Sequence, residues 1–307
     1  MTSAKHAADS AVPPQDLPQV RLRFFLPSAE LSRYVTTYYH MEITPSGDGK
    51  LEDYLHPEWG NIRIGLGGDL AAGVGTEALA PVPRFVATGP TSLSTRFSVS
   101  SGRFWGIGLL PLGWLKFVNA PARLYADRFV DGGADPAFAM FAPLTRSLFG
   151  ENADLDAEAK RIDTHMAALV GQRLNDEDAV TKVHSALVNT QIATVSELAE
   201  QADMSVRSLE RFSRKAFGFT PKLLLRRQRF LRSLSEFMLD PSLSWLKTMD
   251  HLYHDQAHFV RDFKRFMSMT PNQYRDLPHP ILMAAVRGRA EAAGQTMQGL
   301  HDPGTSS

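Results

Sequence analysis

Apolar and polar residues alternate in short runs over the first third of the chain. RLRFFL, YVTTYYHMEI, NIRIGL, RFVAT, TRFSVS and RFWGIGLL approach a period of two and are bounded by Gly, Pro, Ser or Asn. Such runs predict an antiparallel sheet that closes on itself or packs on a second sheet. We therefore expect a β-rich barrel or sandwich-like domain over residues 20–150, with short helices near 111–118 and 135–148.

The period becomes helical further along the chain. Leu155, Ala159, Ile162, Met166 and Leu169 recur at intervals of four and three residues, which predicts an amphipathic helix in a connector over residues 151–178. A stripe of this kind is usually covered within its own chain. The alternative is that it pairs with a second copy in a homodimer.

Residues 179–277 are helical in period throughout, and the helix starts can be read from the sequence. Thr194 and Glu197 have the spacing of a capping box. Further N-caps are predicted at Ser205, Thr220, Asp255 and Thr270. Residues 1–19 and 278–307 are predicted to be tails, the first disordered and the second mostly so. The fold class is thus α+β, with a β-rich domain followed by an all-α domain.

One helix pattern occurs twice in the helical part. SVRSLERFSRKAFGFTP, residues 205–221, aligns without a gap with DQAHFVRDFKRFMSMTP, residues 255–271, and both end in Thr-Pro. Each copy has one apolar stripe and a basic outer face, and each follows a shorter helix and a tight turn. This order is typical of a helix-turn-helix unit, whose second helix enters the major groove of DNA.

These segments also resemble the AraC/XylS family of transcription regulators, over roughly residues 179–275. MSVRSLERFSRKAFGFTPKLLLRRQRFLRSL and YHDQAHFVRDFKRFMSMTPNQYR carry the resemblance. It implies a double helix-turn-helix domain joined by a long helix, and a β-rich domain that binds a small effector or dimerises. The chain departs from the family pattern at Ser213, Leu252 and Ser268, where the family commonly has Phe, Gly and Gly.

The resemblance assigns two sets of DNA contacts. Base contacts are expected from Ser205, Arg207, Glu210, Arg211, Gln256, Ala257, His258 and Arg261. Phosphate contacts are expected from Arg214, Lys215, Lys264, Arg265, Arg226 and Arg227. Side-chain chemistry suits these roles, because arginine can bind guanine with two hydrogen bonds, glutamine pairs with adenine and glutamate accepts from cytosine.

Composition supports a nucleic-acid partner for the helical part. Residues 179–280 hold 15 Lys and Arg against 10 Asp and Glu, whereas the remainder of the neutral chain holds 18 against 23. There is no cysteine, no signal-peptide pattern and no apolar run long enough to span a membrane. We expect a cytoplasmic protein without a membrane partner.

Candidate chemistry other than DNA binding is sparse. No paired carboxylates or catalytic triad is present. His254 and His258 have the helical spacing of a zinc pair, but Asp255 as an N-cap places His254 outside the helix of His258. We expect no enzyme activity, cofactor or metal. Aromatic residues that could line an effector pocket are Trp59, Phe85, Phe97, Phe104, Trp105 and Trp114, and the alternative is plain core.

The sequence as a whole predicts a sequence-specific DNA-binding transcription regulator. Its partners would be double-stranded DNA, a small-molecule effector if the β-rich domain binds one, RNA polymerase if it activates, and a second copy if it dimerises. Two alternatives remain at this point. One is an enzyme of the β-rich domain with an attached DNA-binding module, and the other is an architectural protein that binds DNA without sequence preference.

Overall fold

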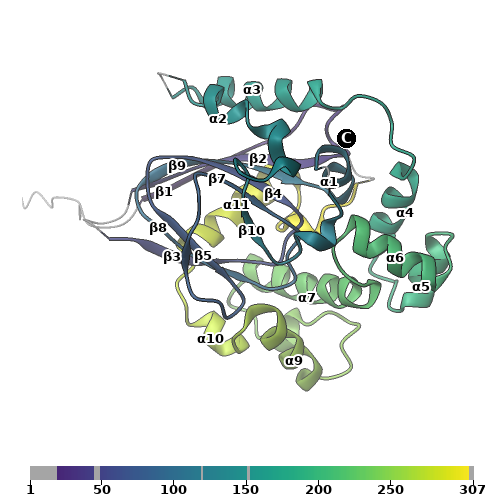
Figure 1. The fold of residues 1–307 in the computed structure, drawn as a ribbon. Helices are drawn as coiled ribbons and strands as arrows, with labels where there is room; N and C mark the ends of the chain where they lie inside the picture. The colour runs from purple at the N-terminus through teal and green to yellow at the C-terminus, as the bar shows by residue number, and fades with distance from the viewer. Residues whose placement is uncertain (1–18, 45–48, 119, 151–152, 304–307) are drawn as a thin grey trace, which may run out of the picture.

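Two antiparallel sheets face each other in the N-terminal half (Figure 1). This computed structural model describes residues 19–44, 49–118, 120–150 and 153–303. The larger sheet has the order β1 (Gln19–Phe25), β2 (Val35–Thr44), β9 (Gly102–Leu109), β4 (Asn61–Leu66), β7 (Phe85–Thr88), β10 (Phe129–Asp131). The smaller has the order β3 (Leu51–Leu55), β8 (Thr95–Val99), β5 (Leu70–Val74), β6 (Ala80–Pro81). The predicted β-rich sandwich is confirmed.

Alternation decides which side of each strand faces the interior. In β1, Arg21 and Arg23 are exposed, whereas Leu22 and Phe24 turn inward toward the second sheet. β1 pairs with β2 along its whole length, from Gln19 opposite Thr44 to Phe25 opposite Tyr38. The period of two in the sequence therefore becomes an inner face shared by both sheets.

Short helices follow the sheets, and a longer one lies across the outside of the larger sheet (Figure 1). They are α1 (Pro111–Phe117), the 3-10 helices η1 (Ala122–Leu124) and η2 (Pro136–Phe141), α2 (Leu144–Ser147) and α3 (Leu155–Ala168).

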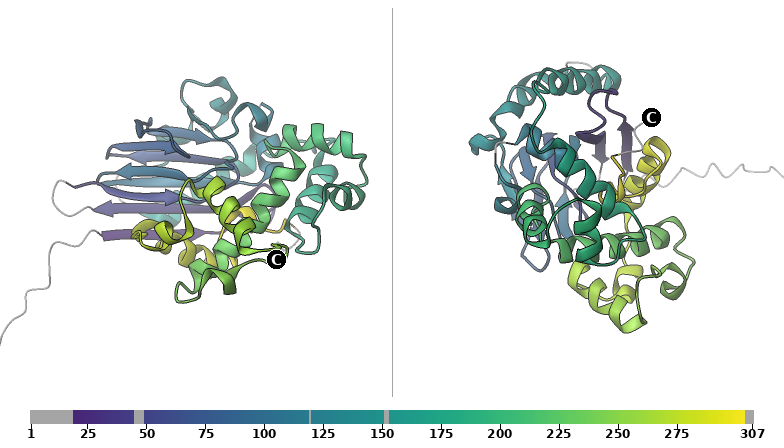
Figure 2. Two further views of the ribbon diagram at one scale, coloured as in Figure 1. Left: turned by 90° about the horizontal axis from the view of Figure 1, so that it is seen from below. Right: turned by 90° about the vertical axis from the view of Figure 1, so that its right-hand side faces the viewer.

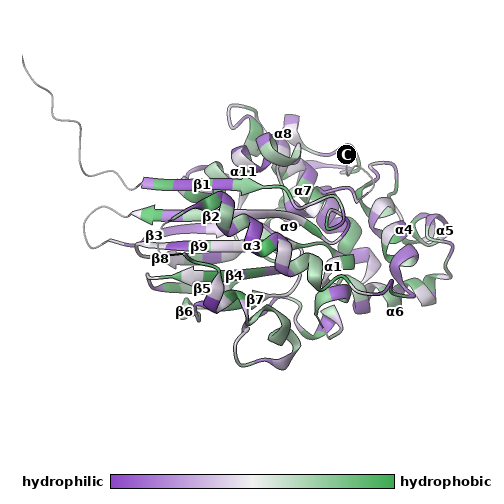
Figure 3. Ribbon diagram, turned by 90° about the horizontal axis from the view of Figure 1, so that it is seen from above, coloured by the Kyte–Doolittle hydropathy of each residue, from purple (hydrophilic) through white to green (hydrophobic). Residues whose placement is uncertain are grey.

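The stripe of α3 is covered within the chain, since Ala159, Ile162 and Met166 are buried. Hydrophilic and hydrophobic residues alternate along this helix in Figure 3. Glu158 fixes the helix to the sheet by accepting hydrogen bonds from Trp105 Nε1 at 2.6 Å and Arg103 Nη2 at 2.9 Å. The intramolecular alternative thus holds for this stripe, and it is not free to pair with a second copy.

The helical part contains α4 (Glu177–Val188), α5 (Val195–Gln201), α6 (Val206–Ala216), α7 (Pro221–Leu239), α8 (Trp245–Thr248), α9 (Gln256–Met267) and α10 (Pro271–Arg275). Thr194 and Glu197 form the predicted capping box at the start of α5. The predicted caps at Ser205, Thr220, Asp255 and Thr270 all accept a backbone N–H in the first turn. These helix starts were decided locally, by side chains next to the free N–H groups.

The two copies of the repeated pattern end in the same backbone conformation. Gly218 has φ of +83° and Ser268, 50 positions later, has φ of +59°. The left-handed region favours glycine because a side chain there crowds the following carbonyl. Ser268 therefore keeps the turn of the first copy although it lacks the glycine that the family commonly has.

The C-terminal segment is ordered where it is described. The prediction that residues 278–307 form a mostly disordered tail is wrong over 278–303, which contain α11 (Pro280–Ala293) and η3 (Gln298–Leu300). α11 packs on β1 and β3, and Figure 2 shows it beside the strands. Its order comes from this tertiary contact, because its Ala-rich sequence has no strong amphipathic stripe. Of the predicted N-terminal tail, residues 1–18 lie outside the described residues, and Gln19 begins β1.

The sheets and the first part of the helical region share one core. Trp59 and Trp105 from the β-rich part belong to the same buried cluster as Leu198, Leu209 and Leu224 from α5, α6 and α7. A second cluster lies among α7, α8, α9, α10 and α11. The first helical unit is therefore packed directly against the sheets.

Candidate nucleic-acid interface and internal cavity

The first recognition element is α6, which follows α5 after a tight turn. Asp203 in this turn has φ of +53°. Leu209 and Ala216 of α6 are buried, whereas Arg207, Glu210 and Arg211 are exposed. The predicted base-contacting side chains of this helix thus lie on its outer face, together with the exposed N-cap Ser205.

The second element is α9, which follows the short helix α8. Its buried side is aromatic, because Phe259, Phe263 and Phe266 lie in the second core cluster. Gln256, Ala257 and Arg261 are exposed. His258 is different, since its side chain is only 24% exposed and its Nε2 lies 3.1 Å from Arg229 Nη2. Burial first, and then the charge of Arg229, lower the pKa of His258.

A groove lies between the two units. It is lined by Thr194, Lys222, Arg226, Arg229 and His258, among others. Three of these five side chains are permanently cationic, so the groove is basic. His258 of α9 and Thr194, the N-cap of α5, both line it, so the groove lies beside both helices.

Asp262 fastens α9 to α7. Its fully buried carboxylate is the partner of Arg226, and it accepts hydrogen bonds from Arg229 Nη2 at 3.3 Å and from the Tyr253 hydroxyl at 3.2 Å. Burial, followed by the charge of Asp262, raises the pKa of Tyr253. Asp262 is not among the site residues that the sequence predicts. Asp262 follows Phe259 by three residues and therefore lies on the buried face of α9, which could have indicated this role from the sequence.

The predicted phosphate contacts differ in solvent exposure and in the ion pairs that they form. Lys264 and Arg265 are exposed in the last turn of α9. Arg214 is exposed and lies 3.4 Å from Glu210, and Lys215 lies 2.6 Å from Asp176. Exposed pairs of this kind are weak and can open. Arg226 is half-buried in its ion pair with Asp262.

Arg227 cannot be a phosphate contact, so this prediction is wrong. Its side chain is fully buried where α7 meets the sheets, with its guanidinium 3.7 Å from the ring centre of Trp59. Arg227 Nη1 donates to the backbone oxygen of Thr91 at 2.9 Å and to that of Glu58 at 3.4 Å. Burial lowers its pKa to about 9, so it remains charged at neutral pH, held by the face of the indole and by carbonyl oxygens.

Salt dependence separates a phosphate contact from a buried arginine. Arg214→Ala is expected to reduce the slope of log K against log salt concentration by about 1, because one phosphate contact is lost. Arg227→Ala is expected to leave that slope unchanged. Fluorescence anisotropy with a labelled duplex over a range of salt concentrations measures both. A lower slope for Arg227→Ala would contradict the buried position of this side chain.

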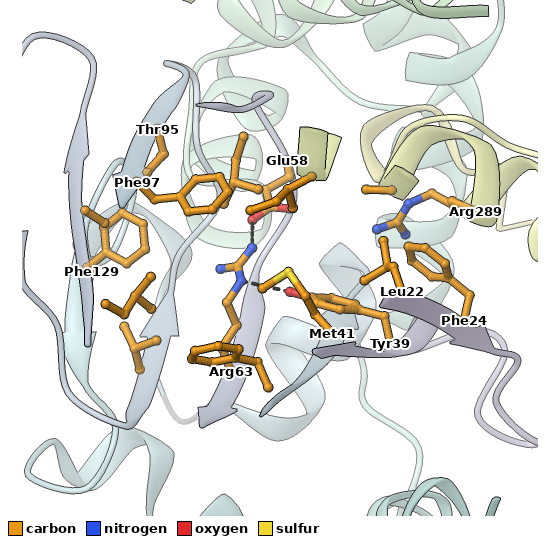
Figure 4. Close-up of a pocket in the computed structure, with 17 residues that line it drawn as sticks. Leu22, Phe24, Tyr39, Met41, Glu58, Arg63, Thr95, Phe97, Phe129 and Arg289 are labelled. Atoms are coloured by element: carbon orange, nitrogen blue, oxygen red, sulfur yellow. Dashed lines mark hydrogen bonds and ion pairs between the residues drawn. The ribbon is translucent and has the colours of Figure 1, made fainter. Parts of the chain in front are cut away.

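A cavity lies between the two sheets and α11 (Figure 4). Its walls are mainly apolar and come from both sheets, including Leu22, Met41, Leu70, Val86, Phe97, Phe104 and Phe129. Polar groups enter it at two places. At one, Arg63 is paired with Glu58 and donates from Nε to the Tyr39 hydroxyl at 2.8 Å. At the other, Arg289 comes from α11.

Two of the six predicted pocket aromatics line this cavity, namely Phe97 and Phe104. The other four do not. Phe85, Trp105 and Trp114 are buried core, and Trp59 lies against Arg227 at the junction with the helices. Tyr39, Glu58, Arg63 and Arg289 were missed, because nothing in a single sequence brings strands β2 and β4 and a C-terminal helix to one cavity.

Comparison with known families bears on the helical part. Residues 198–276 match the family model described as a helix-turn-helix domain. The matched span runs from α5 to the end of α10 and includes both recognition helices. This segment is an AraC-type helix-turn-helix domain. The chain therefore carries the DNA-binding domain of a transcription regulator.

No curated protein sequence matches the chain significantly. Among solved structures, ToxT from Vibrio cholerae is 11% identical with a TM-score of 0.40, over 84% of this chain and 98% of that one. ToxT from Vibrio cholerae O395 bound to (E)-4-(8-methylnaphthalen-1-yl)but-3-enoic acid is 10% identical with a TM-score of 0.41, again over 84% and 98%. The AraC-like transcriptional activator CuxR is 13% identical with a TM-score of 0.29, over 72% and 88%.

Within the described ranges the structure shows neither a membrane-spanning helix nor a cluster of metal ligands. No helix there is long and apolar enough to cross a membrane. No group of three or more His, Cys, Asp or Glu side chains among the described residues is placed to hold a metal ion.

Proposed function

We propose that this protein regulates transcription by sequence-specific DNA binding, and that a small molecule in the cavity between the sheets controls that binding. The observation that carries the proposal is the pair of recognition helices. Each has a buried apolar side and an exposed outer face with an arginine at the same position of the repeat, Arg211 in α6 and Arg261 in α9.

The outer faces differ in chemistry and would read different bases. Arg207, Glu210 and Arg211 on α6 suit guanine and cytosine, while Gln256 on α9 suits adenine and Ala257 can pack on a thymine methyl group. The basic groove between the units is in the right place to hold the DNA backbone that passes from one groove segment to the next. One chain would thereby read an asymmetric site.

Regulation by a ligand is supported by the cavity itself. It is enclosed by both sheets, mainly apolar, and supplied with a few convergent polar groups, which is the usual character of a small-molecule site. The function is binding and not catalysis, and we place it in the cytoplasm. Contact with RNA polymerase and formation of a homodimer remain predictions.

Selection of bound sequences from a random DNA pool tests the proposal. The wild-type chain should enrich a two-part consensus. Arg211→Ala should lose preference in one part and Arg261→Ala in the other, each at a cost of about 1 to 3 kcal/mol. Arg214→Ala is the control, because loss of a phosphate contact weakens all sequences alike.

Two results would contradict the proposal. If no consensus is enriched, and random competitor DNA displaces the probe as well as any selected sequence, the protein is an architectural binder. If the two arginine variants lose the same positions, the two helices do not read separate segments.

A further inference from the structure

α11 lies outside the matched helix-turn-helix domain, which ends at residue 276, and is anchored on the β-rich part. The buried carboxylate of Asp53 in β3 caps it. Asp53 Oδ2 accepts from the backbone N–H groups of Ile281 at 2.9 Å and Leu282 at 2.8 Å, and Oδ1 lies 3.1 Å from His279 Nδ1. The helix is therefore held in one position over the cavity.

One face of α11 forms part of the cavity wall. Ile281, Ala285 and Arg289 line the cavity and are spaced four residues apart, one turn after another. Figure 4 shows Arg289 on the side of Leu22 and Phe24, across the cavity from Arg63 and Glu58. The C-terminal helix thus contributes both apolar surface and a charge.

The two arginines of the cavity differ in how their charge is balanced. Arg63 is paired with Glu58, and its Nη1 also donates to Thr88 Oγ1 at 3.0 Å. Arg289 Nη1 donates to Thr37 Oγ1 at 3.0 Å, and its guanidinium lies 4.9 Å from the ring centre of Phe24. Within the described residues Arg289 forms no ion pair with a carboxylate, so one positive charge in the cavity is left uncompensated.

An uncompensated cation in an apolar enclosure is costly. Burial lowers the pKa of Arg289, which is the sign of that cost. A negatively charged group beside the guanidinium would restore the balance through charge-assisted hydrogen bonds, which a neutral group forms less strongly. The apolar walls would cover the rest of such a molecule.

We infer that Arg289 is the recognition residue of the cavity and binds the anionic group of an amphipathic organic anion whose apolar body lies between the sheets. The inference rests on the proposed effector role of the cavity and adds the ligand class and the residue that selects it. It also makes α11 part of the effector site. Because α11 directly follows α10, a ligand held by Arg289 would tie the second helix-turn-helix unit to the sheets.

Three probes with one apolar body and different charges test this in the full chain. Isothermal titration calorimetry with 4-phenylbutyrate, 4-phenylbutanol and 4-phenylbutylamine should show the carboxylate binding at least about tenfold more tightly than the other two. Arg289→Gln should abolish the preference for the carboxylate. Arg289→Lys should retain most of it, since the positive charge remains.

Arg287→Gln is the matched control, because Arg287 lies on the same helix and is exposed. It should bind the three probes as the wild-type chain does. If Arg289→Gln fails to fold, the wild-type preference and the Arg289→Lys result still decide the matter.

Equal binding of the three probes to the wild-type chain, or an unchanged preference in Arg289→Gln, overturns the inference. Binding of none of them, by a protein that still enriches its DNA consensus, overturns it as well and leaves the DNA-binding function intact. Loss of the DNA consensus would instead count against the proposed function.

Discussion

Asp262→Ala is expected to lower the free energy of unfolding by about 3 to 5 kcal/mol, because it removes a fully buried acceptor that α7 and the loop before α9 share. The carboxylate is fully buried and serves Arg226, Arg229 and Tyr253. Without it, the partly buried guanidinium groups of Arg226 and Arg229 would keep their charge and lose their partner. Urea unfolding at neutral pH measures the change.

The same substitution should impair one half of the DNA site. Asp262 lies in α9 and fixes that helix to α7, so without it the second recognition helix would no longer be held in its position for DNA contact. α6 packs in the other core cluster and should keep its position. Glu236→Ala is the control. Glu236 is an exposed carboxylate of α7, and its loss should change stability by less than about 0.5 kcal/mol. Equal stability of Asp262→Ala and Glu236→Ala would show that the network contributes nothing.

Mild acid is expected to destabilise the fold by a comparable amount. Burial, with the charge of His279 next, lowers the pKa of His56 to about 3, and burial, with the charges of His301 and Arg227 next, lowers that of His184 to about 3. Below about pH 6.5 the unfolded chain binds protons at both histidines and the folded chain does not. Stability is therefore lost as the pH falls from about 6.5 toward 3.

Each histidine should contribute up to about 1.4 kcal/mol per pH unit well below pH 6.5, which amounts to roughly 3 kcal/mol for the pair between pH 6.5 and 5. Urea midpoints measured at several pH values test this. His184→Leu should remove about half of the dependence, whereas His254→Gln should leave it unchanged, because His254 is exposed. A stability that is constant between pH 6.5 and 5 would rule out buried neutral histidines at these positions.

Both expected effects concern contacts that join parts of the chain. His184 lies between the rings of Trp59, 5.4 Å away, and Phe217, 6.2 Å away, where α4 and α6 meet the loop before β4. His56 Nε2 lies 2.7 Å from the Tyr274 hydroxyl and so connects that loop to α10. The sheets and the helix-turn-helix units are thus joined by aromatic contacts as well as by α11.

The local features of the fold could be predicted from the sequence. A cap such as Ser205 or Asp255 works within one turn of its own helix, and the period of β1 decides which of its side chains face inward. The repeated helix pattern identified both units, and the outer faces of α6 and α9 carry the expected residues except for the partly covered His258. Each of these depends on residues within a few positions of one another.

Contacts between distant residues could not be predicted, and only the tertiary structure decided them. Arg226 and Arg227 are neighbours, but the 100° step of a helix points one at Asp262 and the other at Trp59, and nothing near them in the sequence distinguishes the two. α11 is ordered by Asp53, more than two hundred residues earlier. The cavity exists because two sheets and that helix enclose it. The sequence by itself therefore determined the double helix-turn-helix domain, and packing determined where the proposed effector site lies.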